Sequence, residues 1–106
     1  MARALINLPT SAAKGEVIEV RALIAHPMET GFRPGADGQV LPRDIVTRFA
    51  CRYAGETVFT ADLHPAIAAN PYLSFFIRAT ESGTLEFEWI GDKGFSQTER
   101  RELQVA

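Results

Sequence analysis

The fold class is most evident from the segment Ile45-Val-Thr-Arg-Phe-Ala-Cys-Arg-Tyr53. Its mainly apolar odd positions alternate with Arg48 and Arg52, and a period of two residues is typical of a strand with one buried face. Ala54-Gly55 breaks the alternation, which resumes over residues 57–63. Two alternating segments joined by a short glycine-containing turn predict an antiparallel hairpin.

The same period recurs on both sides of this hairpin. Apolar residues occupy most even positions of residues 15–24 and the odd positions of residues 73–79 and 85–89. The expected strands cover residues 4–8, 15–24, 45–53, 57–63, 73–79, 85–89 and 95–105. About seven short strands without a helical repeat predict an all-β fold, an immunoglobulin-like antiparallel β-sandwich, although the two cysteines of antibody domains are missing.

Length and charge favour one ordinary domain spanning residues 1–106. The chain has 11 Lys plus Arg against 13 Asp plus Glu, a formal net charge of −2, and 46% of its residues are apolar. A chain of this size buries enough surface to fold without a metal or a disulfide. Because the cations are scattered, neither a nucleic acid nor a membrane surface is an expected partner. No apolar run approaches the length of a membrane-spanning helix.

One long connection interrupts the series of strands. Residues 25–44 contain three Pro and three Gly, which disfavour both helix and strand. Loops longer than about 12 to 15 residues are usually functional or mobile. We therefore single out this Pro-rich loop for its role in function.

His26, Met28, Cys51 and His64 are the residue types that hold copper in blue-copper proteins. Those sites gather their Cys, His and Met on one loop, whereas Cys51 lies within an expected strand, 13 residues before His64. A single Cys also excludes an internal disulfide and a Cys-rich metal site. We predict no metal and no cofactor, and we predict that Cys51 is a small core residue on the inward side of its strand.

The sequence contains none of the common catalytic motifs. It has no Gly-rich phosphate loop, no Gly-x-Ser-x-Gly turn and no His-Glu-x-x-His helix. Glu86 and Glu88 share one strand face, but no apolar neighbour on that face tunes them for acid/base catalysis. We interpret them as a solvated face and predict that the chain is not an enzyme.

Two aromatic residues occupy the outward positions of the strand expected over residues 73–79 and just before it. The odd positions of this strand already supply a core face, so Tyr72 and Phe76 point the other way. Burying an aromatic side chain is worth roughly 1.5 to 3 kcal/mol, and leaving both in water sacrifices that stabilisation. Either the Pro-rich loop or another protein is expected to cover them.

Two motifs resemble those of a known family. They are His26-Pro-Met-Glu-Thr-Gly31 and Ala61-Asp-Leu-His-Pro-Ala-Ile-Ala-Ala-Asn-Pro-Tyr-Leu-Ser-Phe-Phe76, the second followed by Ala79-Thr-Glu-Ser-Gly83. Both closely resemble the SoxZ family of sulfur-oxidation proteins. The resemblance runs from about residue 15 to residue 89 and fades after Gly94, where Thr98-Glu-Arg-Arg-Glu102 is less typical of the family.

The resemblance implies an immunoglobulin-like sandwich without chemistry of its own, the scaffold subunit of the SoxYZ sulfur-carrier complex in thiosulfate oxidation. Proteins of the SoxY type carry sulfur intermediates on a cysteine in a flexible Gly-Gly-Cys-Gly-Gly tail. This chain instead ends Glu102-Leu-Gln-Val-Ala106, so the carrier thiol is expected on the partner. The implied partners are SoxY, in a heterodimer or a pair of heterodimers, and transiently the other Sox enzymes.

The expected binding surface centres on the aromatic strand. Whether Phe75 or Phe76 faces the partner is open, because a β-bulge would exchange them. Pro-containing segments are expected to shape the rim of the surface, since rigid segments lose little entropy on docking. The candidate interface residues are His26, Met28, His64, Pro65, Pro71, Tyr72, Leu73, Phe75 and Phe76.

Localisation depends on which argument is followed. Residues 1–9 hold too few consecutive apolar residues for a secretory signal peptide, which alone predicts a cytoplasmic protein. The resemblance implies the periplasm instead, reached by co-export with a SoxY that bears a twin-arginine signal. We expect the second, periplasmic localisation without a signal peptide of the chain's own.

Two other functions stay open at this point. The chain is alternatively a free-standing β-sandwich that binds a ligand unrelated to sulfur metabolism. A third reading is a metal-binding electron carrier, which the spacing of the metal-binding residue types disfavours.

Overall fold

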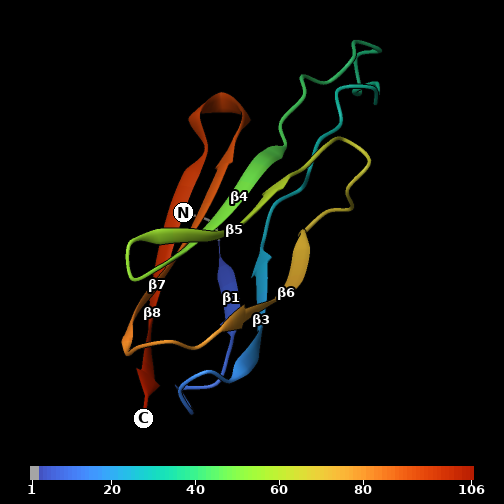
Figure 1. The fold of residues 1–106 in the computed structure, drawn as a ribbon. Helices are drawn as coiled ribbons and strands as arrows, with labels where there is room; N and C mark the ends of the chain where they lie inside the picture. Colours follow the sequence, from blue (N-terminus) through green and yellow to red (C-terminus); the bar gives the residue numbers. More distant parts are fainter. Residues whose placement is uncertain (1–2) are drawn as a thin grey trace.

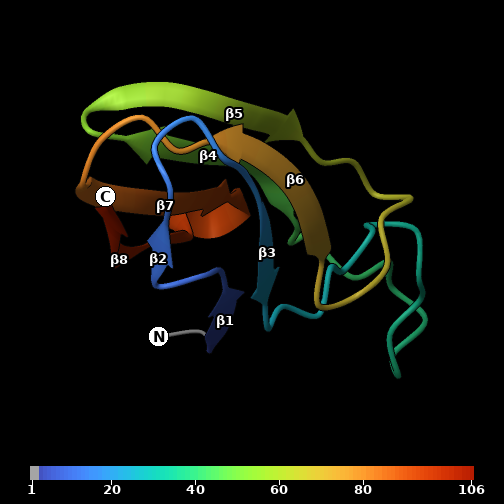
Figure 2. The same cartoon turned by 60° about the horizontal axis from the view of Figure 1, so that its bottom comes forward.

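A computed structural model describes residues 3–106 as eight strands and one short 3-10 turn. The elements are β1 (Ala4–Asn7), β2 (Ser11–Ala12), β3 (Val17–Ile24), β4 (Val46–Tyr53), β5 (Glu56–Asp62), β6 (Tyr72–Arg78), β7 (Gly83–Gly91), η1 (Asp92–Gly94) and β8 (Ser96–Val105). They form a three-stranded sheet in the order β1-β3-β6 and a five-stranded sheet in the order β2-β8-β7-β4-β5. The two sheets are the layers of a sandwich (Figures 1 and 2). The prediction of an all-β sandwich is confirmed.

The strand order also confirms the immunoglobulin-like topology. In that fold the second and fifth of the seven basic strands, B and E, share one sheet, and strands G, F and C share the other. Here β3 and β6 pair in the small sheet, while β8, β7 and β4 follow one another in the large sheet. Strand β2 pairs with β8 in parallel, and the other strand pairs within residues 3–106 are antiparallel. This part of the chain contains no helix long and apolar enough to cross a membrane.

The predicted hairpin is formed by β4 and β5. Its turn residues Ala54 and Gly55 both have positive φ, 51° and 84°. Two central residues at positive φ define a type I′ turn, whose twist matches the twist of the paired strands. The turn therefore pairs Tyr53 with Glu56 directly, and the register of the two strands shifts once, between Cys51 and Arg52.

The core lies between the two sheets and follows the predicted alternation. Its centre is Phe49 on β4, whose ring centroid lies 5.2 Å from that of Trp89 and 5.9 Å from that of Phe75. Because Phe75 belongs to the small sheet and Trp89 to the large one, this contact joins the two layers. Further buried side chains on the predicted inward positions are Ile18, Val20, Ala22, Ile24, Cys51, Tyr53, Ile77, Leu85 and Phe87.

Tyr53 fixes one end of the sandwich. Its hydroxyl accepts hydrogen bonds from the backbone N–H groups of Thr80 (3.2 Å) and Glu81 (3.0 Å). It also donates to the carbonyl oxygen of Glu81. A buried side chain of β4 thereby satisfies the backbone of the turn between β6 and β7, and positions the end of β6.

Candidate partner-binding surface

Strand β6 presents two different faces. Phe75 and Ile77 are buried between the sheets, whereas the side chains of Tyr72 and Phe76 are 56% and 67% exposed. The pairing of β6 with β3 is continuous from residue 72 to residue 78, so no bulge exchanges the two phenylalanines. Phe76 therefore faces outward, and Phe75 is a core residue. The prediction of Phe75 as a candidate interface residue is wrong, because its side chain is not exposed.

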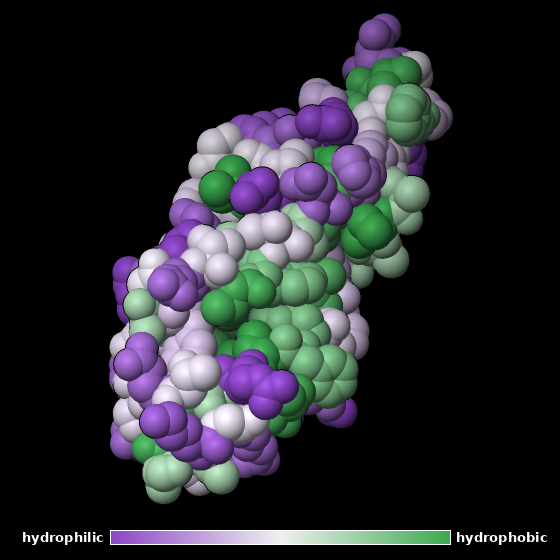
Figure 3. Space-filling model, in the orientation of Figure 1, coloured by the Kyte–Doolittle hydropathy of each residue, from purple (hydrophilic) through white to green (hydrophobic). Residues whose placement is uncertain are grey.

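Phe75 instead closes the sandwich at its β5–β6 side. Its ring stacks on that of Phe59, with centroids 4.2 Å apart and an angle of 3° between the planes. Phe59 lies on β5, the last strand of the large sheet, and β6 is the last strand of the small sheet. Two sheet edges thus meet at one pair of stacked rings. Figure 3 shows apolar surface gathered over β6 and toward β5 on this side of the molecule.

The apolar surface also extends across the outer face of the small sheet. The strand register places Leu5 opposite Leu23, and Leu23 opposite Tyr72, in one row across three strands. Leu5 is 52% exposed, and a surface depression of about 430 Å³ lies along this row. Leu5 and Leu23 were not among the candidate residues predicted from the sequence, although their outward parity is the same signal that identified Tyr72.

The charged groups of Glu19 and Arg21 on this face are paired with each other. Ser74 Oγ donates to Glu19 Oε2 (2.7 Å), and Arg21 Nη2 donates to Glu19 Oε1 (2.9 Å). The Ser74 hydrogen bond and then that of Arg21 hold the pKa of Glu19 below its ordinary value. Since these polar groups satisfy each other, the aromatic and aliphatic side chains are what this face offers to a partner.

The other candidate interface residues divide into exposed and buried ones. His64 is exposed, and Pro65 and Leu73 are half-buried. Pro71, His26 and Met28 are buried, so their side chains are not available to a partner. The segment before β6 nevertheless joins the start of the Pro-rich loop, because the backbone N–H of His26 donates to Asn70 Oδ1 (2.9 Å). The backbone N–H of Asn70 donates to the His26 carbonyl in return (2.7 Å).

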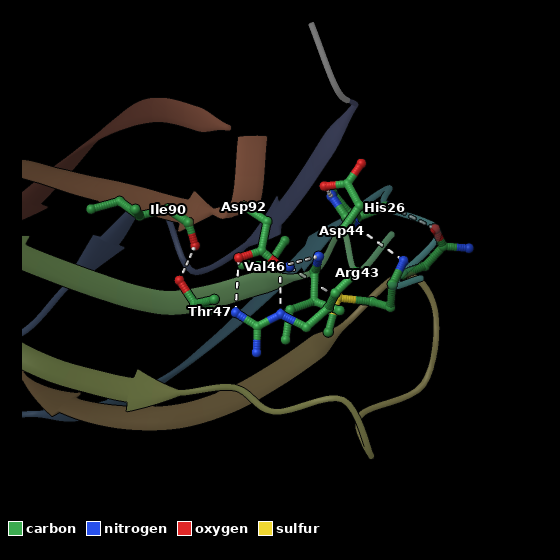
Figure 4. A network of polar contacts seen from close by, with 10 residues as sticks. His26, Arg43, Asp44, Val46, Thr47, Ile90 and Asp92 are labelled. Carbon is green, nitrogen blue, oxygen red and sulfur yellow. Dashed lines mark hydrogen bonds and ion pairs between the residues drawn. The ribbon is translucent and has the colours of Figure 1, made fainter. Parts of the chain in front are cut away.

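His26 and Met28 have a structural role at the base of the Pro-rich loop. The N–H of Met28 donates to His26 Nδ1 (3.0 Å), and the N–H of Val46 donates to Met28 Sδ (3.2 Å). These contacts tie the first residues of the loop to the start of β4, as Figure 4 shows. Met28 has a φ of 53°, a conformation that its buried contacts hold in place.

The loop itself extends away from the sandwich (Figure 1). Isolated bridges between Glu29 and Asp44 and between Pro34 and Val40 hold its two sides together. Phe32 is 80% exposed and Val40 60% exposed. The loop therefore does not cover Tyr72 or Phe76. The sequence left two ways to cover these side chains, this loop or another protein, and only another protein remains.

A bidentate ion pair anchors the returning side of this loop. Arg43 Nε and Nη2 each donate to a carboxylate oxygen of Asp92 at 2.9 Å, and the N–H of Ile45 donates to Asp92 Oδ2 (3.1 Å). The Arg43 hydrogen bond and then the Ile45 N–H hold the pKa of Asp92 below its ordinary value. Asp92 thus links the turn after β7 to the end of the loop (Figure 4).

Asp92→Asn is expected to lower stability at neutral pH more than at acidic pH. A carboxyl group whose pKa is depressed in the folded state stabilises the fold above its unfolded pKa, roughly 4, and this stabilisation is lost as the pH falls through the folded pKa. The urea midpoints of the variant and the unsubstituted chain should therefore differ at pH 7 and converge toward pH 3. Asp62→Asn, at an exposed and loosely paired carboxylate, is the control. If the urea midpoints of the two proteins differ by the same amount at both pH values, the stabilisation does not come from the ionised carboxylate of Asp92.

Glu86 and Glu88 lie on the outward face of β7, as predicted, but they are half-buried and ion-paired rather than free in solvent. Arg52 Nε donates to Glu86 Oε1 (2.8 Å), and Arg52 Nη2 lies 3.2 Å from Glu88 Oε1. Chiefly because of the Arg52 hydrogen bond, the pKa of Glu86 is lowered. A carboxylate held in its ionised form is poorly suited to act as a general acid.

Cys51 is fully buried in β4, as predicted. Burial raises the pKa of its thiol to about 12, so the reactive thiolate is scarce at neutral pH. Within residues 3–106, no three His, Cys, Asp or Glu side chains are grouped closely enough to hold a metal ion. His26, Met28, Cys51 and His64 therefore form neither a copper site nor an accessible thiol site in this part of the chain.

Comparison with known families tests the resemblance of the two motifs. The family described as "Sulphur oxidation protein SoxZ" matches residues 6–102. The chain belongs to the SoxZ family. The match includes the charged residues after Gly94, where the motifs alone gave no support. It assigns the chain to the sulfur-oxidation (Sox) system. No curated protein matches the chain.

Solved structures share the fold of this SoxZ-family chain. The sulfur carrier protein SoxY from Chlorobium limicola f thiosulfatophilum has a TM-score of 0.69 and 17% identity, over 97% of this chain and 78% of its own. Superoxide reductase (neelaredoxin) from Ignicoccus hospitalis has a TM-score of 0.77 and 17% identity, over 99% and 82%. A putative superoxide reductase from Thermotoga maritima has a TM-score of 0.74 and 13% identity, over 97% and 85%. At these identities the likeness concerns the fold alone.

Proposed function

We propose that this chain is the scaffold subunit of a sulfur-carrier complex and binds a SoxY partner through the outer side of β6. The observation that carries the proposal is the exposure of Tyr72 and Phe76, which no part of residues 3–106 covers. Membership of the SoxZ family supports SoxY as the partner. The same family membership disfavours a free-standing binding module unrelated to sulfur metabolism.

The composition of the surface suits a stable interface. Aromatic side chains act as binding hot spots when a partner excludes water from them. Tyr72 and Phe76 supply two such side chains, and the row formed by Leu5 and Leu23 enlarges the apolar area beside them. The paired charges of Glu19 and Arg21 lie among these apolar groups. A central apolar area with paired polar groups is the usual anatomy of a protein–protein interface.

The carrier thiol belongs to the partner in this proposal. Cys51 is buried and its pKa is raised, so it is unsuited to accept and release sulfur intermediates. Residues 1–106 act as one domain that presents the carrier subunit to the enzymes of thiosulfate oxidation. These enzymes contact the complex only transiently, and the chain itself catalyses no step.

The complex is proposed to work in the periplasm. In this proposal the chain reaches that compartment bound to a SoxY that bears an export signal. Co-export requires a complex that forms before transport and survives it, and an extensive apolar interface is typical of such permanent complexes.

Phe76→Asp is expected to weaken binding to a co-expressed SoxY by about 100-fold or more. The substitution places a charge where an aromatic side chain would be desolvated, and hot-spot losses reach several kcal/mol. Affinity purification through a tag on SoxY, followed by gel filtration, measures the yield of the 1:1 complex. Circular dichroism of the variant should stay β-rich, since Phe76 is largely exposed.

Ile90→Asp is the matched control. Ile90 is also an exposed apolar residue, but it lies on β7 in the five-stranded sheet. The Ile90→Asp substitution should therefore leave the yield of the 1:1 complex unchanged. Equal yields from Phe76→Asp and the unsubstituted chain would place the interface elsewhere, and failure of the unsubstituted chain to bind SoxY would overturn the proposed function.

A further inference from the structure

The backbone of β6 has unpaired groups along its outer edge. The N–H of Ile24 donates to the Pro71 carbonyl (3.2 Å), and the N–H of Ala79 donates to the Glu16 carbonyl (2.7 Å). Both contacts to the β3 side use odd-numbered residues of the β6 segment. Backbone groups alternate between the two sides of a strand. Those that point away from β3 therefore belong to Tyr72, Ser74, Phe76 and Arg78.

This edge lacks the features that usually protect a sheet edge. Natural edge strands are short, bulged, charged or interrupted by proline, because a free edge invites pairing with another chain. Strand β6 has seven residues, a continuous register with β3, no proline and one charged side chain, Arg78 at its end. It is thus a long, regular and largely apolar edge.

The other edges within residues 3–106 are better protected. Strand β1 has four residues. Strand β8 is partly covered by β2 and carries the charged run Glu99-Arg-Arg-Glu102. Strand β5 begins and ends with Glu56 and Asp62, and its pairing with β4 has a register shift. The contrast singles out β6 as the edge prepared for a further strand.

Space for such a strand lies beside the edge. A surface depression of about 450 Å³ separates the second half of β6 from the first half of β5. Phe76 and Ile77 line one side, Val58 the other, and Glu56 and Arg78 lie at its margin. Thr80 and Glu81 also line the depression, so its surface is mixed rather than purely apolar. An added strand would place apolar side chains against Phe76 and Val58 and polar ones near Glu56 and Arg78.

We propose that the SoxY partner adds one of its own strands to β6, so that the three-stranded sheet continues across the interface. This inference rests on the proposed function and specifies how the partner is held. Backbone donors and acceptors repeat along the edge about every 6.7 Å, a spacing that another extended peptide matches. A SoxY of known structure has the same sandwich fold as this chain, and a sandwich of this kind has sheet edges to contribute.

Alternate amides of β6 should report strand addition. We expect the N–H groups of Ser74, Phe76 and Arg78 to exchange with solvent at least about 100-fold more slowly in the SoxY complex than in the isolated chain. The N–H groups of Phe75 and Ile77 are already paired with β3 and should change little. Residue-resolved hydrogen exchange by NMR measures both sets. A complex that forms while the even-numbered amides exchange as in the isolated chain overturns strand addition and leaves the proposed function intact.

A proline scan gives a second, independent test. Ser74→Pro removes an N–H that does not contribute to the β3 ladder, so the fold should tolerate it while affinity for SoxY falls about 30-fold or more. Ser74→Ala loses the same side-chain contact to Glu19, so the difference between the two variants isolates the backbone N–H. Thr60→Pro is the matched control on β5. The Leu63 N–H donates to the Thr47 carbonyl, so odd residues of this segment face β4 and the Thr60 N–H faces outward.

The outcomes separate the two proposals. If the Ser74→Pro variant binds SoxY as tightly as the Ser74→Ala variant, strand addition is overturned. The same holds if Ser74→Pro and Thr60→Pro lose the same amount of affinity for SoxY. If Ser74→Pro does not fold, the exchange measurement decides. Protection of the even-numbered amides in the isolated chain, together with a dimer on gel filtration, would identify a second copy as the occupant and contradict the assignment to SoxY. Absence of any SoxY binding would instead remove the proposed function itself.

Discussion

Phe49→Ala is expected to lower the free energy of unfolding by about 3 to 5 kcal/mol. The Phe49 side chain is fully buried, and its ring contacts Phe87 and Trp89 in its own sheet and Phe75 in the facing sheet. Removing the ring loses its transfer free energy and leaves a cavity where the two layers meet. Because small domains are stable by roughly 5 to 15 kcal/mol, this single change consumes a large part of the total.

Urea unfolding followed by tryptophan fluorescence measures this loss directly. Trp89 is the only tryptophan of the chain and lies 5.2 Å from Phe49 between ring centroids, so its emission reports on this part of the core. Phe32→Ala, at a phenylalanine that is 80% exposed, should change the stability by less than about 0.5 kcal/mol. A loss below about 1 kcal/mol for Phe49→Ala would show that the facing sheet does not depend on this ring.

The sequence predicted the strands well because one physical pattern determines them. A strand with one buried face must alternate, and Phe49, Cys51 and Leu85 are buried where the alternation placed them. The hairpin was predictable for a similar reason, since a glycine in a two-residue turn accepts the positive φ that the turn needs. Strand β2 was not predicted, because two residues are too few to show a period.

The site was predicted less completely than the fold. Parity on a single strand predicted that Tyr72 faces outward, but it left Phe75 and Phe76 open because a bulge would exchange them. The continuous register of β6 with β3 decides that Phe76 faces outward and Phe75 inward. The row of Leu5, Leu23 and Tyr72 depends on the register between strands that are far apart in sequence, and one sequence does not reveal that register. The alternation along one strand identifies which of its side chains point outward. A continuous surface also depends on how several strands pair, and the alternation does not reveal that.

His26 and Met28 show a different reason for failure. They lie in a loop without a period, and no alternation indicates on which side a loop residue is buried. Their burial depends on hydrogen bonds to Asn70 and Val46, 44 and 18 residues away along the chain. In this structure the motif that contains them therefore anchors the Pro-rich loop.

Cys51 is expected to react with a disulfide reagent at least about a thousandfold more slowly in the folded chain than in the unfolded one. Burial raises the pKa of this thiol to about 12, whereas a free cysteine has a pKa near 8.5. Only the thiolate attacks a disulfide, and at pH 7.5 the upward shift lowers the thiolate fraction by roughly three orders of magnitude. The core around Cys51 slows the reagent further, so labelling should proceed through unfolding.

Labelling with an aromatic disulfide at pH 7.5, with and without 6 M guanidinium, measures the ratio. The unfolded chain supplies the control because it contains the same single thiol. Cys51→Ala should in addition form the SoxY complex in normal yield and support thiosulfate oxidation in a reconstituted system, because the proposed function assigns the carrier thiol to the partner. Rapid labelling of the folded chain, together with a loss of turnover in a folded Cys51→Ala variant, would mean that this subunit handles sulfur itself. If Cys51 labels slowly and the Cys51→Ala variant supports full turnover, the thiol has no part in the function. The proposed function then rests on β6 and its neighbouring strands.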